Sequence, residues 1–220
     1  MTGDRELADL YRETRGRLTS LVEDLDERAL RTPVEACPGW SVRDVMAHVT
    51  AVAEDVLSGR LTRPPTDEET AAQIARFDGV ELADVLGRWA AVAPELEPLL
   101  SVFDVWPAVS DVASHEQDVR EALGAEGARD CDAIRLGAER LITLLDPPVP
   151  LRVVVEDADF RVGPSEGQEL VLRTSRFETF RWRLGRRSRA QLSHLDWSGD
   201  PAPVLDHLVV FGPARNDLVE

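Results

Sequence analysis

Three prolines within four positions divide the sequence into two parts with different patterns: Pro147, Pro148 and Pro150. Before them, apolar residues recur at helical spacing, and no stretch gives a convincing strand pattern. After them, the segments LRVVVEDADFRVG and QELVLRTS indicate short strands around acidic or polar turns. Because proline interrupts both helices and strand ladders, we expect a helical bundle over residues 1–146 and a small α+β domain over residues 150–220.

The bundle should consist of amphipathic helices separated by proline and glycine. They are expected at residues 5–25, 41–57, 66–77, 80–101, 107–123 and 130–145. Ser41 with Asp44 and Thr66 with Glu69 form Ser/Thr-x-x-acid capping boxes, which indicate where two of these helices begin. In the second part, RFETFRWRLGRRSRAQL predicts a helix interrupted at Gly185, and residues 201–210 predict a short final helix.

Charge and composition exclude several classes of function. With 25 basic and 41 acidic residues the formal charge is −16, which argues against a nucleic acid or an anionic membrane as the main partner. The sequence contains no lysine, so lysine-based catalysis is excluded. Two cysteines provide no disulfide framework and suit a reducing compartment. No apolar stretch is long enough to span a bilayer, and the N-terminus is polar, so a cytoplasmic protein is expected.

Two of the four histidines follow an acidic residue by four positions. Asp44 precedes His48, and Asp111 precedes His115, so each pair lies on one helical face. An acid and an imidazole in this arrangement, joined by a histidine from a facing helix, provide three ligands for zinc or a similar ion. The same spacing also fits a simple intrahelical ion pair. Asp44 is better explained as the capping partner of Ser41 than as a ligand.

The motifs around these histidines add a family resemblance. Residues 37–49 read CPGWSVRDVMAHV, with Pro38-Gly39-Trp40-Ser41 leading into the His48 helix, and residues 110–124 read SDVASHEQDVREALG. Their order and spacing resemble the mycothiol-dependent maleylpyruvate isomerase family, a branch of the DinB-like four-helix bundle superfamily. The C-terminal FRWRLGRRSRAQL and DWSGDP resemble the small sterol-carrier-like second domain of that family.

This resemblance implies a fold and a metal site. It implies an up-and-down DinB-like bundle followed by a small α+β domain, with His48, Asp111 and His115 as ligands of a divalent metal, zinc being the first candidate. The acidic ligand of the family is commonly glutamate. Aspartate is one methylene shorter, so either the helix that carries Asp111 lies closer to its neighbour or a water intervenes.

The resemblance also implies a function. Mycothiol would be the cosubstrate, bound as a thiolate at the metal, and would add to a small electrophile in an isomerase or S-transferase reaction. Arg186 and Arg187, in the densest basic cluster of the chain, are candidates to hold a substrate carboxylate, although they equally fit a solvated charged face. Two alternatives stay open: a non-enzymatic metal-binding or regulatory protein, and a metal-activated hydrolase.

Other reactive or aromatic residues have ordinary structural explanations. Cys37 precedes a helix and could act as a nucleophile, but a small buried thiol is the more common role. Trp40 could line a ligand pocket or pack into the core as a hydrophobic staple. His194 and His207 have no acidic residue at helical spacing and are interpreted as structural or surface residues.

Overall fold

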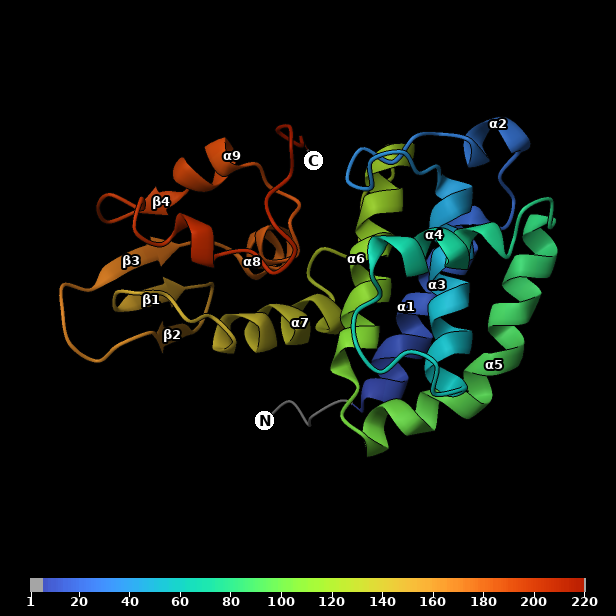
Figure 1. Cartoon of the computed structure of the whole chain (residues 1–220), viewed down its shortest axis with the longest axis horizontal. Coiled ribbons are helices and arrows are strands. Elements are labelled where there is room, and N and C mark those ends of the chain that lie inside the picture. The colour runs from blue at the N-terminus through green and yellow to red at the C-terminus, as the bar shows by residue number, and fades with distance from the viewer. Residues whose placement is uncertain (1–5, 220) are drawn as a thin grey trace. The chain divides into compact units, whose positions relative to one another are not determined.

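The computed structural model describes residues 6–219, and the chain divides into two compact units, Met1–Gly127 and Ala128–Glu220 (Figure 1). The predicted mainly helical class with a small C-terminal sheet is confirmed. Arg5, at which the first helix was expected to begin, lies outside the described residues.

The first unit is a bundle of four long helices with two short ones. The helices are α1 (Leu7–Val22), α2 (Glu27–Leu30), α3 (Val42–Leu57), α4 (Asp67–Ala75), α5 (Leu82–Val102) and α6 (Trp106–Leu123). Helices α1 and α3 each pack against both α5 and α6, and α4 packs on α3. Helices α5 and α6 therefore both lie against α1 and α3, and α3 is in direct contact with α6.

Local sequence signals explain the helix boundaries. Both predicted capping boxes are present, at Ser41 with Asp44 and at Thr66 with Glu69. Helix α2 was not predicted; it begins where the side chain of Asp26 accepts a hydrogen bond from the backbone of Ala29.

Pro94 and Pro98 were expected to kink or shorten their helix. Helix α5 is bent, in agreement with a kink, but it is not shortened and continues through both prolines to Val102 (Figure 1). Both prolines are exposed, whereas Trp89 and Leu96 on the other face are buried. The carbonyls that the prolines leave without intrahelical donors therefore lie on the solvent face, while packing stabilises the helix on the opposite side.

The second unit contains a four-stranded sheet with helices. Its elements are α7 (Asp132–Thr143), β1 (Leu151–Val154), β2 (Asp159–Val162), β3 (Leu170–Arg173), α8 (Arg176–Arg183), α9 (Arg189–Ser193), β4 (Asp196–Trp197) and a 3-10 turn (Leu205–His207). The strand order is β2-β1-β3-β4, with β1 and β3 parallel and both outer pairs antiparallel. The predicted interruption at Gly185 separates α8 from α9, and the short β4 was expected to be loop.

The boundary between the units differs from the one expected at residues 146–150. Helix α7 packs against α8 and β2, and its Ile142 belongs to the same apolar core as Leu151, Val153 and Trp182. The helical pattern of this segment predicts an apolar stripe, but it does not identify the surface that buries the stripe.

Among residues 6–219, no helix combines the length and apolar character required to cross a bilayer.

Candidate metal centre

The first unit brings His48, Asp111 and His115 together from two helices. His48 lies in the second turn of α3, whose start is fixed by the Ser41 capping box. Asp111 and His115 lie one turn apart on α6. Because α3 and α6 pack directly against each other, the three side chains meet, and their possible ligand atoms all lie within 4.8 Å of one another.

The shorter aspartate side chain reaches both imidazoles. Its Oδ1 lies 3.6 Å from Nε2 of His115 and 3.9 Å from Nε2 of His48. Ligands about 2.0–2.1 Å from a tetrahedral zinc ion are separated from one another by roughly 3.4 Å. The observed separations are slightly longer, so shifts of a few tenths of an ångström would bring these atoms to ligand positions.

The environment of His48 provides a test of whether a cation fits. The side chain is 5% exposed, and its Nδ1 is buried with no hydrogen-bond partner among the described residues. Its Nε2, at 3.9 Å from the carboxylate, is beyond normal hydrogen-bond distance. The gap between Nε2 and Oδ1 of Asp111 is too long for a direct hydrogen bond but suits a cation bound between them; Nδ1 would keep its present environment. The donor set therefore fits a divalent ion.

The candidate site differs in exposure from one side to the other. Both histidine side chains are nearly buried, at 5% and 7% exposure, whereas the Asp111 side chain is 32% exposed. Three protein donors with one of them near the surface leave access for a fourth ligand, as in catalytic rather than closed structural zinc sites.

Trp40 forms a wall of the site. Its indole ring stacks on His115 at a centroid distance of 6.0 Å and lies 5.0 Å from the ring of His48. The residue is partly exposed and also lines a surface pocket of about 370 Å³ together with Pro38, Ser41 and Asp44. The indole ring therefore packs on the two histidines and also borders a surface pocket.

Two buried residues lie on the other side of the His115 ring. Oδ2 of Asp118 is 3.1 Å from Nδ1 of His115, and the thiol of Cys37 donates to the same oxygen at 3.6 Å. No role for Asp118 was expected from the sequence. The available signal was its position three residues after His115, which places both side chains on one face of α6.

The burial of Cys37 agrees with the expectation of a small buried thiol. Cys37 is 8% exposed and its Sγ lies 3.9 Å from Nδ1 of His115, so it is a buried hydrogen-bonding neighbour of the site. Cys131 lies in the second unit, at the residue that precedes α7.

The remaining predicted residues lie in the second unit. Arg187 is buried and makes a two-pronged ion pair with Glu178, with distances of 2.6 and 2.7 Å. Arg186 is half-buried and donates to the backbone carbonyl of Leu184. Their expected role in binding a carboxylate stays a prediction. His194 and His207 are both exposed.

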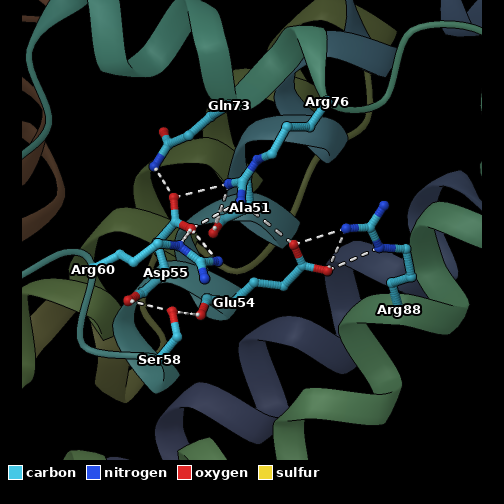
Figure 2. A network of polar contacts seen from close by, with 8 residues as sticks. All are labelled: Ala51, Glu54, Asp55, Ser58, Arg60, Gln73, Arg76 and Arg88. Atoms are coloured by element: carbon cyan, nitrogen blue, oxygen red, sulfur yellow. Dashed lines mark hydrogen bonds and ion pairs between the residues drawn. The ribbon is translucent and has the colours of Figure 1, made fainter.

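A polar network fixes the far end of α3 (Figure 2). The buried Asp55 carboxylate accepts hydrogen bonds from Arg60, Gln73 and Arg76. Its neighbour Glu54 forms a two-pronged pair with Arg88 of α5. Burial opposes ionisation of Asp55, but the hydrogen bonds from Arg76, Gln73 and Arg60 outweigh it, and the net effect lowers its pKa. Helix α3 is therefore held to α4 and α5 at the end opposite His48.

Comparisons with known proteins agree with the resemblance noted in the sequence. Residues 11–98 match the sequence profile of a family described as Mycothiol maleylpyruvate isomerase N-terminal domain, which confirms that resemblance. No curated protein sequence gives a significant match.

Two solved structures have a similar fold. One is mycothiol-dependent maleylpyruvate isomerase, with 18% sequence identity and a TM-score of 0.52. The other is a histidine-to-alanine mutant of mycothiol-dependent maleylpyruvate isomerase, with 16% identity and a TM-score of 0.57. Each match covers 81% of this chain and 88% of the other. These matches support the mainly helical fold.

Proposed function

We propose that this chain holds a divalent cation between His48, Asp111 and His115, and uses mycothiol as the thiol cosubstrate of an isomerase or S-transferase reaction on a small electrophile. The observation that carries the proposal is the convergence of three metal-binding side chains from α3 and α6, with their donor atoms within 4.8 Å. Two imidazoles and one carboxylate form a donor set typical of catalytic zinc.

A divalent cation bound at this position would supply Lewis-acid chemistry, which favours the thiolate form of an incoming thiol near neutral pH. The need for such chemistry follows from the chain itself, since it has no lysine and its Cys37 thiol is buried. The nucleophile of a thiol-dependent reaction would therefore come from the cosubstrate.

The side chains around the donor atoms have separate tasks in this proposal. The carboxylate of Asp111 supplies the negative charge of the ligand set. Both histidines bind as neutral ligands and exclude solvent from the inner side of the site. Trp40 covers the two imidazole rings and limits the direction from which a thiol approaches.

The choice of mycothiol and of an isomerase-type reaction is supported by the family match over residues 11–98 and by the two similar structures. A small substrate with an activated double bond, or with a leaving group, suits a thiol nucleophile. If the substrate is anionic, Arg186 and Arg187 are both candidates to bind its charge; Arg187 would do so while paired with Glu178.

The proposal is tested by measuring metal content and mycothiol binding of the purified protein. We expect about one divalent ion per chain, and mycothiol binding that requires the metal and releases about one proton near neutral pH. Isothermal calorimetry of metal-loaded and metal-free protein, in two buffers with different ionisation enthalpies, measures both quantities.

Other outcomes would identify other functions. Equal mycothiol affinity with and without metal, or binding without proton release, would contradict the thiolate chemistry. Metal-dependent hydrolysis without thiol would identify a hydrolase. Metal binding with neither activity across an electrophile panel would identify a non-enzymatic metal-binding protein.

A further inference from the structure

The two ring nitrogens of His115 face two different acidic residues. Nε2 faces Asp111 at 3.6 Å, on the side where His48 also lies. Nδ1 faces Asp118 at 3.1 Å, which is within hydrogen-bond distance. Asp118 is 1% exposed, so this contact is made away from solvent.

We propose that Asp118 is a positioning residue that fixes the tautomer and orientation of His115, and that Cys37 supports it; this inference rests on the proposed metal site. A neutral imidazole carries one proton, and the nitrogen that bears it is set by the hydrogen bond that the ring makes. With Asp118 accepting from Nδ1–H, the lone pair of Nε2 points toward Asp111 and His48. Metal-binding histidines are commonly oriented in this way by a carboxylate behind the ring.

The thiol of Cys37 adds a second donor to the same carboxylate oxygen. Its Sγ lies 3.6 Å from Oδ2 of Asp118 and is 8% exposed. Two donors that converge on one oxygen restrict the rotation of the carboxylate, so Cys37 helps to hold the acceptor in place. Thus Cys37 acts on the site through Asp118.

A competing arrangement would place a metal between Cys37, His115 and Asp118, whose possible ligand atoms also lie within 4.8 Å of one another. The contact between Asp118 and His115 argues against it. Nδ1 and Oδ2 are 3.1 Å apart, within hydrogen-bond distance, so this pair is satisfied without a metal, unlike the longer contacts of Asp111. A direct hydrogen bond accounts for this distance better.

His48 has no corresponding support, because its Nδ1 has no hydrogen-bond partner among the described residues. The two histidines should therefore differ: the His115 ring is held in place by Asp118, and the His48 ring is free of such a constraint. Loss of Asp118 should therefore weaken metal binding by His115, which is the better oriented of the two histidines.

The test compares D118N with wild type in the full-length protein. In metal-free protein, nitrogen NMR of the histidine rings should show the Nδ1–H tautomer for His115, and D118N should shift it toward Nε2–H because the amide also offers a donor. In competition titrations with zinc, D118N should bind about 10–100-fold more weakly. C37A should weaken zinc binding less than D118N does.

The matched control is E116Q, which neutralises a fully buried carboxylate on the same helix that pairs with Arg17 and Arg120 instead. E116Q should lower thermal stability and leave zinc affinity and the His115 tautomer unchanged. This control distinguishes loss of positioning from loss of folding.

Several results would overturn the inference. They are an Nε2–H tautomer of His115 in wild type, equal zinc affinity of wild type and D118N, or a thiolate-to-cobalt absorption band in the cobalt-substituted protein that C37S removes. If wild type binds no metal, the proposed function fails, and the tautomer of the metal-free protein still decides whether Asp118 orients His115.

Discussion

Oδ1 of Asp111 lies 3.9 Å from Nε2 of His48, although the two residues are on different helices and aspartate is the shorter of the two acidic side chains. Because α3 packs directly against α6, the shorter carboxylate still comes close to the His48 ring. The carboxylate is also the most exposed of the three side chains, so a further ligand would approach from the side of the site where Asp111 lies.

Asp111→Asn should therefore weaken zinc binding by at least about tenfold, because one of three ligands loses its charge. Thiol-dependent activity should fall together with metal content. Asp111→Glu restores the carboxylate and should bind zinc more tightly than Asp111→Asn. Calorimetric titration with zinc measures the three affinities, and equal affinity of all three proteins would exclude Asp111 as a ligand.

His115→Ala should remove most of the bound metal, since one of the three proposed ligands is lost. His194→Ala and His207→Ala are controls, because both histidines are exposed in the second unit. Elemental analysis of the purified variants should give metal-depleted His115→Ala and two controls with wild-type metal content. Wild-type content in His115→Ala would place the metal elsewhere.

Trp40→Ala should accelerate loss of metal to a chelator, because the indole covers both imidazole rings. Trp40→Phe retains an aromatic cover and should release metal at a rate closer to wild type. Stopped-flow measurement with a coloured chelator follows this release directly. Identical rates in all three proteins would show that Trp40 does not shield the site.

Asp55→Asn should destabilise the first unit by about 1–3 kcal/mol at neutral pH, because hydrogen bonds to a buried charged group are lost. The pKa of Asp55 is lowered in the folded protein. Its ionised form therefore contributes stability that is fully present above the unfolded-state pKa, about 3.9, and that is lost as pH falls through the lower folded pKa.

Denaturant unfolding of wild type and Asp55→Asn between pH 3 and pH 7 checks this prediction. The difference between them should be largest at neutral pH and shrink below about pH 4. Arg31→Gln is the control, because it removes an exposed ion pair with Glu27 that should contribute little. A difference that does not depend on pH would contradict the assigned role of the Asp55 charge.

Arg187→Gln should destabilise the second unit, because it leaves Glu178 without its two-pronged partner. Arg186→Gln should raise the KM of the substrate if that substrate is anionic. Thermal unfolding and steady-state kinetics separate the two effects. A lower KM, or an unchanged one with an anionic substrate, would remove Arg186 from the candidates for substrate binding.

Much of the architecture follows from local sequence signals. Helical periodicity and the capping boxes at Ser41 and Thr66 predicted most helices of the first unit, since these features depend only on neighbouring residues. The one-turn spacing of Asp111 and His115 likewise follows from the helix that contains them. The boundary of the second unit did not follow, because the partner of the apolar stripe on α7 is fixed by packing with α8 and β2.

The candidate site depends on both the amino-acid sequence and the tertiary packing. The family resemblance of the sequence motifs implied His48, Asp111 and His115 as the candidates, and the helical spacing that pairs Asp111 with His115 is local. Tertiary packing decided whether the shorter Asp111 reaches His48, since that distance depends on the separation of α3 and α6. It also placed Cys37 beside Asp118, across 81 positions of sequence. Helical periodicity predicts which face a residue occupies, but it does not specify the residues that a distant segment brings to that face.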